Sequence, residues 1–382
     1  MNYDLIIARY GEVGLKSPRV RARFERKLSS NIKSAFECDI NINQARIFIY
    51  PKDFNEACKK LKKIFGIVSF SPAILTKTTF DDIENTLNEY SDKLINDGLL
   101  SSDTKFAVRC RRVGKHEFSS QELAAFAGAV IVKKIAPPVD LTNPELEVFL
   151  EVREDDSYIF HEKIKGPGGL PLGTQGRLVA LLSSGIDSPV AVYLMMKRGC
   201  AITALYFDNE PFTSSKATEK FEKIVDKLNE YAYGAPIRKK IVNYGDYLEK
   251  CKDDAPEKLT CILCKSGMYK IANEVVKKEN ALGIVDGNSV GQVASQTLHN
   301  ILATRFDTDF PILSPLIGFD KVEIEKIAKE IGTYPISIIN DDGCSAVPRY
   351  PETKADLDRV NEAIEDINQE DEIKKAVDNL YK

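Results

Sequence analysis

Residues 183–188 have the types and spacing needed to bind a polyphosphate. They read Ser-Ser-Gly-Ile-Asp-Ser and follow an apolar run, 178–182, that has the length of a buried strand. Helical periodicity begins after Pro189. A strand, a turn of small residues and a helix N-terminus aim several backbone N–H groups at one point, where the helix dipole also favours an anion. The sequence therefore predicts an anion site, unless the segment is an ordinary strand-to-helix turn.

The pattern discriminates between two kinds of nucleotide loop. No lysine follows Gly185, so the stretch does not match the Gly-x-x-x-x-Gly-Lys-Ser/Thr loop. It fits Ser-Gly-Gly-x-Asp-Ser, the loop that holds the pyrophosphate of ATP in enzymes that adenylate a substrate, although Ser184 replaces the first glycine. Ser183 and Ser188 would hold the pyrophosphate together with loop N–H groups. Asp187 would either hold Mg²⁺ against the phosphates or cap the helix.

Three of the eight cysteines have a spacing that suggests metal or sulfur chemistry. Cys261 and Cys264 form a Cys-x-x-Cys pair in an expected loop before a helix, and Cys344 lies in the turn 341–345. A structural zinc site would need a fourth ligand, for which His299 is the one candidate. A thioredoxin-like redox pair would follow a strand in a different fold. An iron–sulfur cluster with three thiolates and one open iron would use all three cysteines.

The composition indicates a globular chain with an uneven charge distribution. With 382 residues, 43% of them hydrophobic, it can form two or three domains. No apolar run approaches the roughly 18 residues of a membrane span, and there is no signal-peptide pattern, so we expect a cytoplasmic protein. The net charge is −4, yet residues 1–30 carry seven basic and three acidic side chains, and residues 352–382 carry ten acidic and five basic ones. A basic face for a phosphate backbone is therefore compatible with an acidic chain.

Strand and helix signals divide the sequence into three blocks. Residues 1–70 interleave strands and helices at the size of a small ferredoxin-like α+β unit, and residues 71–165 repeat that style. The Gly- and Pro-rich segment 166–176 is the clearest linker. Alternating strands and helices over 177–382 predict an α/β fold, a doubly wound parallel sheet that binds ligands at the carboxyl ends of its strands. The expected strands are 5–9, 46–50, 105–110, 146–152, 157–161, 178–182, 201–206, 237–241 and 282–286, and the expected helices are 20–36, 54–65, 81–96, 120–135, 189–198, 215–232, 265–279, 295–303 and 321–331.

Further motifs follow one another in a recognisable order. Arg-Tyr-Gly-Glu occurs at 9–12, and Phe-Ala-Val-Arg-Cys-Arg-Arg occurs at 106–112, followed by Ser-Ser-Gln-Glu. Beyond the loop come the segments 286–297, 311–318 and 331–334. Together these motifs resemble the tRNA 4-thiouridine synthetases, the ThiI family, and the resemblance runs from residue 9 to about residue 354. It implies a THUMP RNA-binding domain over 71–165 and a PP-loop ATP pyrophosphatase domain over 177–382.

The resemblance also implies an activity and its residues. Family members use ATP and Mg²⁺ to adenylate O4 of uridine 8 in tRNA and then replace that oxygen with sulfur. The catalytic residues would be Asp187, Cys261, Cys264 and Cys344. The ATP contacts would be Leu181, Leu182, Ser183, Ser184, Gly185, Asp187, Ser188, Tyr206, Phe207, Lys265, Gly287 and Gln296. The tRNA contacts would be Lys16, Arg19, Arg23, Arg109, Arg111, Arg112 and Lys115.

Two sulfur-transfer routes exist among members of the family. Some use a [4Fe-4S] cluster held by three cysteines, here Cys261, Cys264 and Cys344, and others use a C-terminal rhodanese domain with a persulfide. After Cys344 the sequence indicates an acidic amphipathic helix and no rhodanese domain, so we expect the cluster, with persulfide transfer through Cys344 as the alternative. The expected partners are tRNA and a sulfur donor, either inorganic sulfide or a cysteine desulfurase, in a chain that could be a homodimer. The competing functions are a PP-loop thiolase acting on another base and a non-catalytic tRNA-binding protein.

Overall fold

The computed structural model describes residues 3–43, 45–306, 308–341 and 343–382. The chain divides into two compact units. One holds the residues up to Glu25 and Ile32–Gly168, and the other holds Arg26–Asn31 and Gly169–Lys382. Each unit is described separately below. No helix among the described residues is long and apolar enough to cross a membrane.

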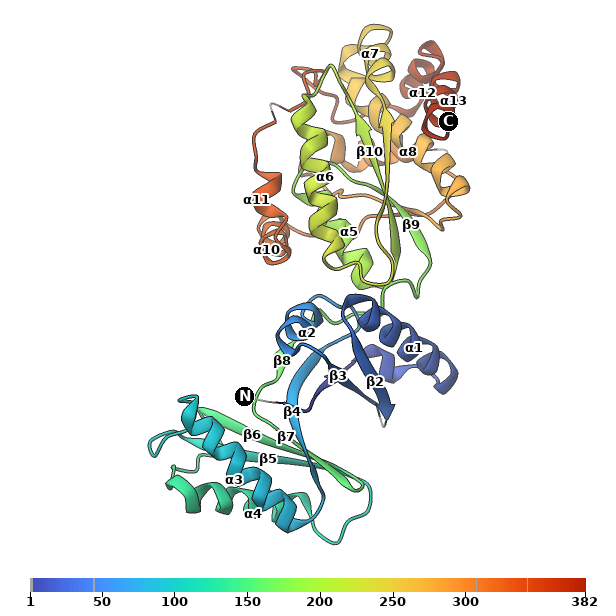
Figure 1. The fold of residues 1–382 in the computed structure, drawn as a ribbon. Helices are drawn as coiled ribbons and strands as arrows, with labels where there is room; N and C mark the ends of the chain where they lie inside the picture. The colour runs from blue at the N-terminus through green and yellow to red at the C-terminus, as the bar shows by residue number, and fades with distance from the viewer. Residues whose placement is uncertain (1–2, 44, 307, 342) are drawn as a thin grey trace. The chain divides into compact units, whose positions relative to one another are not determined.

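The first unit is built on one sheet with the strand order β2-β3-β1-β4-β7-β6-β5, and β8 also pairs with β4 (Figure 1). Its elements are β1 (Leu5–Arg9), η1 (Glu12–Leu15), α1 (Pro18–Ala35), β2 (Cys38–Asn43), β3 (Arg46–Pro51), α2 (Phe54–Leu61), β4 (Ser69–Lys77), α3 (Phe80–Asn96), β5 (Phe106–Val113), α4 (Ser120–Ile135), β6 (Leu146–Arg153), β7 (Asp156–Phe160) and β8 (Ile164–Lys165).

The long strand β4 joins the two halves of this sheet. Its first part pairs with β1, where Ala73 faces Leu5, and its second part pairs with β7, where Ile74 faces Ile159. The boundary expected between residues 70 and 71 lies inside this strand. Helices α3 and α4 pack on β5, β6 and β7 because each presents an apolar stripe at helical spacing. A capping box formed by Ser119 and Glu122 fixes the start of α4.

The second unit is a five-stranded parallel sheet with the order β11-β10-β9-β12-β13. This confirms the predicted doubly wound sheet preceded by α+β structure. Its elements are β9 (Arg177–Leu181), α5 (Asp187–Lys197), β10 (Ala201–Asp208), α6 (Ser215–Asn229), β11 (Arg238–Asn243), α7 (Gly245–Asp253), η2 (Glu257–Leu259), α8 (Thr260–Lys278), β12 (Ile284–Val285), η3 (Ala294–Gln296), α9 (Leu298–Arg305), β13 (Ile312–Leu313), α10 (Lys321–Ile331), α11 (Tyr334–Ser337), α12 (Leu357–Asp366) and α13 (Gln369–Leu380).

Two details of this unit differ from expectation. The helix expected from residue 265 begins at Thr260, so Cys261 and Cys264 lie in its first two turns and not in a loop. The prediction of a loop there was wrong because η2 begins after Pro256 and α8 follows η2 directly. The acidic segment after Cys344 forms two helices, α12 and α13.

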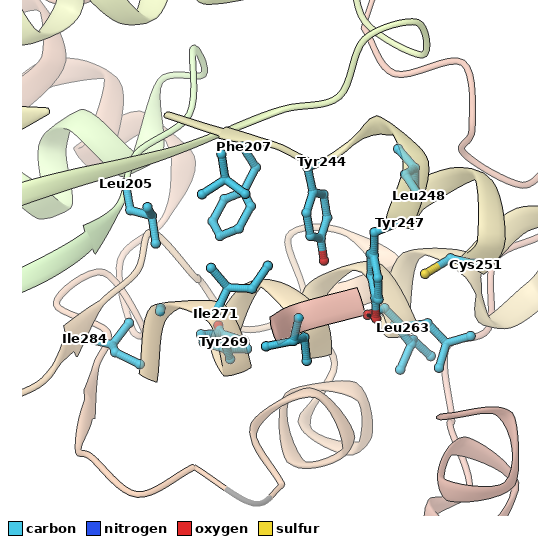
Figure 2. Close-up of a cluster of buried hydrophobic side chains, with 14 of the residues drawn as sticks. Leu205, Phe207, Tyr244, Tyr247, Leu248, Cys251, Leu263, Tyr269, Ile271 and Ile284 are labelled. Carbon is cyan, nitrogen blue, oxygen red and sulfur yellow. Dashed lines mark hydrogen bonds between the residues drawn. The ribbon is translucent and has the colours of Figure 1, made fainter. Parts of the chain in front are cut away.

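The largest buried cluster lies between the parallel sheet and the helices α7, α8, α12 and α13. Figure 2 shows its centre, where Phe207 of β10 faces the ring of Tyr244 and where Tyr247 of α7 lies beside Leu263 of α8. Tyr244 donates to the Cys264 carbonyl at 2.7 Å, and Tyr247 donates to the Leu263 carbonyl at 3.0 Å. The two tyrosines thus fix the turn of α8 that carries the cysteine pair.

Candidate functional site

The strand order reverses between β9 and β12, and the predicted nucleotide loop lies at this point. In doubly wound sheets, ligands bind beyond the carboxyl ends of the strands where the order reverses. The loop connects β9 to α5, and its own side chains hold it: the Ser188 hydroxyl lies 2.9 Å from both the backbone N and the Oγ of Ser183. The Gly185 N–H donates to Ser183 Oγ at 3.3 Å. The loop is therefore held in shape before any ligand arrives.

Gly287 lets the end of β12 approach this loop closely. A Cβ on Gly287 would lie 2.8 Å from the Ser188 backbone N and 2.9 Å from Ser188 Cα, closer than real Cβ atoms pack. A side chain at this position would push the loop away from the sheet. The glycine in the 286–297 motif is thus explained by a close approach of two backbones.

A cavity of about 500 Å³ opens beside the loop and collects the predicted ATP contacts. All twelve of those residues line it, and Cys344 lines it as well. Cys261 and Cys264 do not appear on its wall. The structure therefore brings one of the three cysteines to the nucleotide cavity and places the other two behind it in α8.

Asp187 is the first residue of α5, and two polar side chains bond to its carboxylate. Lys321 Nζ, at the start of α10, lies 2.7 Å from Oδ1, and the Gln292 amide donates to Oδ2 at 2.9 Å. The N-cap residue is Ile186, so the helix-cap interpretation of Asp187 is wrong. The sequence analysis did not identify Lys321, which brings an ammonium group to the loop.

A buried polar network forms the wall of the cavity beyond β12. Asp286 accepts hydrogen bonds from Tyr269 at 2.5 Å and Arg305 at 2.8 Å, and the Ser314 hydroxyl also donates to it at 2.8 Å. Asn288 joins this network through Asp286 and Tyr269. Several partners thus stabilise a carboxylate that is only 4% exposed.

Lys265 reaches the cavity from α8 through this network. Its ammonium donates to Asn288 Oδ1 at 3.0 Å. Burial lowers the pKa of Lys265, and the Asp286 carboxylate opposes that shift. A phosphate in the cavity would favour the charged form of this lysine.

The three cysteines are half-buried free thiols. Burial raises the pKa of Cys261, and the neighbouring Cys344 thiol raises it further. Burial also raises the pKa of Cys264, and Cys251, Cys261 and Cys344 add to that shift. Among the described residues, no group of three His, Cys, Asp or Glu side chains is arranged to hold a metal ion.

The predicted tRNA contacts lie in two places within the first unit. Arg109 and Arg111 lie two positions apart on β5 and line a cavity of about 540 Å³. Arg9, Arg46 and Lys163 line the same cavity, and the sequence analysis did not assign them to RNA. Of the remaining contacts, Arg112 lies on β5 and Lys115 lies in the turn after it. Lys16 lies just before α1, and Arg19 and Arg23 lie in the first turns of α1.

Two of the predicted RNA-binding arginines are already engaged. Arg109 donates to Glu147 at 2.8 Å, and Arg112 donates to the His116 carbonyl at 3.0 Å. Arg111 is exposed. In the same cavity Glu151 is buried among Arg46, Arg153 and Arg9, whose charges lower its pKa in spite of its burial. One carboxylate faces three guanidinium groups, so the cavity keeps an excess of positive charge.

Comparisons with known proteins agree with this architecture. The family model described as thiamine biosynthesis protein (ThiI) matches residues 173–369, the ThiI ferredoxin-like domain matches 5–71, and the THUMP domain matches 77–162. These matches confirm the predicted types of fold in the predicted order. The predicted class of enzyme, a sulfurtransferase, is confirmed at the level of the family.

Individual relatives match along nearly the whole chain. A probable tRNA sulfurtransferase of Methanobrevibacter smithii is 62% identical over 100% of both chains. A probable tRNA sulfurtransferase of Methanothermobacter thermautotrophicus is 60% identical over 98% of this chain and 96% of its own. Among solved structures, a 4-thiouridine synthetase in complex with RNA and with bound ATP has a TM-score of 0.90 and 34% identity, covering 98% of both chains.

Proposed function

This chain belongs to the ThiI family, and we propose that it is an ATP-dependent tRNA sulfurtransferase that converts uridine 8 of tRNA to 4-thiouridine. One observation carries the proposal: the loop at the strand-order reversal, the twelve expected ATP contacts and the Cys344 thiol all line one cavity. Nucleotide chemistry and sulfur chemistry thus share one site. A solved relative with bound ATP and RNA supports the choice of both ligands.

The geometry suits an adenylation step followed by a substitution. O4 of the uridine attacks the α-phosphorus of ATP, the bond from that phosphorus to the bridging oxygen breaks, and pyrophosphate leaves. Lys321 and the loop N–H groups that the loop's own side chains do not engage would stabilise the charge of the departing pyrophosphate. A sulfur nucleophile then forms the bond to C4, and AMP leaves with the former O4. The flipped uridine must be unstacked to reach the cavity, at a cost of about a few kcal/mol.

Asp187 is the residue that would hold Mg²⁺. Its carboxylate faces the cavity and already has a cationic partner in Lys321 at 2.7 Å, so the position is suited to a positive charge. A magnesium ion there would neutralise charge on the phosphates. Lys321, displaced from Asp187, would then be free to contact the polyphosphate.

The three cysteines come from α8 and from the segment that carries Cys344, and burial, with the neighbouring Cys261 and Cys344 thiols, raises the pKa of Cys264. Three thiolates are the ligand set of a cluster that leaves one iron open. We propose that Cys261, Cys264 and Cys344 hold a [4Fe-4S] cluster whose open iron would bind sulfide.

Persulfide transfer through Cys344 is the second candidate. It is favoured by one observation, that Cys344 lines the nucleotide cavity and the other two cysteines do not.

The first unit would position the tRNA through Arg111 and its basic neighbours. The predicted sulfur donor, homodimer and cytoplasmic location stay predictions, as do the domain boundaries 1–70, 71–165 and 177–382.

The nucleotide products of anaerobically purified protein test the proposal. With tRNA, Mg-ATP and sulfide we expect AMP and pyrophosphate to form, and we expect tRNA carrying cytidine at position 8 to suppress both. Release of ADP and inorganic phosphate would contradict an adenylating loop. An iron and sulfide assay with a visible spectrum tests the cluster, because colourless, iron-free protein that is fully active would exclude it. The persulfide route is tested with a cysteine desulfurase and cysteine as the donor, because inorganic sulfide alone cannot form a persulfide on Cys344.

A further inference from the structure

The nucleotide loop is tied directly to the segment that carries Cys344. The Ser184 hydroxyl donates to Asp341 Oδ2 at 3.0 Å. At the end of α11, the Ser337 hydroxyl donates to the Gly185 carbonyl at 3.0 Å. Two consecutive loop residues are therefore bonded to the stretch of chain that leads to the thiol.

Lys220 strengthens this connection with a charge. Its ammonium, on α6, lies 2.9 Å from Asp341 Oδ2 and 2.8 Å from the Ile339 carbonyl. Lys220 is only 4% exposed, so the ion pair is largely shielded from water. Burial alone would raise the pKa of Asp341, but hydrogen bonds from Lys220 and Ser184 hold that pKa below its ordinary value. Asp341 is therefore a carboxylate in the ligand-free state.

The connection depends on the residue that departs from the usual loop. The Ser-Gly-Gly-x-Asp-Ser pattern has glycine where this chain has Ser184, and a glycine has no hydroxyl to offer Asp341. The substitution thus creates one of the two side-chain bonds to the carboxylate. It gives Ser184 a role other than filling space beside the phosphates.

A polyphosphate in the loop would compete for the same groups. Ser184, Lys220 and Asp341 all line the nucleotide cavity, together with Cys344. An anion placed there attracts the Lys220 ammonium and repels the Asp341 carboxylate, and both effects are strong in a shielded site. Nucleotide binding and retention of Asp341 therefore oppose each other.

We propose that Ser184, Lys220 and Asp341 are positioning residues that hold the Cys344 segment against the nucleotide loop and release it when a polyphosphate binds. The inference rests on the proposed function, since it assumes that the loop takes ATP. It orders the reaction: the segment that carries the sulfur-handling thiol becomes mobile after the nucleotide is in place.

Amide hydrogen exchange of the full-length protein tests this release. Peptides covering 338–347 are followed with and without saturating magnesium pyrophosphate, whose binding is measured separately by calorimetry. Bound ligands ordinarily slow exchange, so the sign of the change is diagnostic. We expect exchange in 338–347 to accelerate on the order of tenfold, the equilibrium effect of losing one hydrogen bond to a charged group, while exchange in 183–188 slows.

Two variants separate release from a general loosening of the unit. Ser184→Ala should exchange faster than the unmodified protein in 338–347 even without ligand, and should show a smaller further acceleration with ligand, because the Lys220 bond to Asp341 remains. Ser214→Ala is the matched control, because its hydroxyl contacts only the Asp341 backbone carbonyl, at 3.4 Å, and it should respond like the unmodified protein.

The outcomes separate this inference from the proposed function. If pyrophosphate binds while exchange in 338–347 slows or stays unchanged, the proposed release of the Cys344 segment is wrong. The sulfurtransferase assignment would remain intact. Ligand-free exchange in 338–347 of Ser184→Ala that equals that of the unmodified protein would also overturn the proposed release. If neither ATP nor pyrophosphate binds, the proposed function fails and the release mechanism fails with it.

Discussion

Gly287 offers a test of the nucleotide loop that needs only one added methyl group. In Gly287→Ala the new Cβ would lie 2.8 Å from the Ser188 backbone N and 2.9 Å from Ser188 Cα. These are backbone atoms at the start of α5, so no side-chain rotation can relieve the clash. The loop and the end of β12 must move apart by several tenths of an ångström.

The structure gives the approximate size of the losses in stability and in ATP affinity. Overpacking of this kind costs about 1–3 kcal/mol, which corresponds to a fall in Tm of about 2–4 °C for each kcal/mol in a domain of this size. The displaced atoms belong to the loop whose N–H groups are meant to face the phosphates. If the same strain must be relieved when ATP binds, ATP affinity should fall by about five- to 150-fold.

Gly318→Ala is the matched control for this variant. A Cβ on Gly318 meets no atom within 4 Å, and its backbone is not in the left-handed region, so Tm and ATP affinity should stay near those of the unmodified protein. Thermal unfolding and ATP titration calorimetry on both variants give the two readouts. A Gly287→Ala protein as stable as the control, with unchanged ATP affinity, would refute the packing argument and the placement of the site.

Three other perturbations address the remaining parts of the account. Asp187→Ala should abolish AMP formation while leaving tRNA affinity nearly unchanged in a filter-binding assay, because the residue belongs to the loop; normal 4-thiouridine formation would contradict this. Replacing Arg109 and Arg111 together should weaken tRNA binding. It should also reduce the slope of log affinity against log salt concentration by about 1–2, one unit for each lost phosphate contact. An unaltered slope would mean that these arginines are solvated and do not contact phosphates. In reduced, metal-free protein, Cys261 should alkylate slowly at neutral pH and faster as pH rises, because burial and the Cys344 thiol raise its pKa and only the thiolate reacts; half-maximal alkylation below about pH 8.5, the ordinary thiol value, would contradict it.

The sequence predicted those elements whose local signals agree with their tertiary surroundings. The apolar run that became β9 is buried at its centre, and α4 was predicted with its observed bounds, which its capping box helps to define. Four strands were not predicted, namely the two-residue strands β8 and β13 and the longer strands β2 and β4. The edge strand β2 alternates apolar residues with Asp and Asn, and β4 contains Pro72, which ordinarily argues against a strand. Both form because neighbouring strands pair with them.

The site was predictable where one motif carries it, and it was not where distant residues meet. Lys220 and Asp341 are 121 positions apart. The sequence analysis assigned no role to Lys220, and it noted the turn that contains Asp341 only for Cys344. One signal was present: Lys220 lies on the face of α6 that buries Ala217, Phe221 and Ile224, and a lysine on an apolar face needs a partner. Similarly, Lys321 lies at the start of an expected helix, where nothing in the sequence indicates a functional role, and only the fold brings it to Asp187.

The most direct test of the central claim is the modified nucleoside itself. Purified protein is incubated anaerobically with unmodified tRNA, Mg-ATP and sulfide, and the tRNA is then digested and mapped by mass spectrometry. The account predicts ATP-dependent 4-thiouridine at position 8 and none when Asp187 is replaced by Ala. Thiolation at another base, or no thiolation by protein that binds both ATP and tRNA, would contradict it.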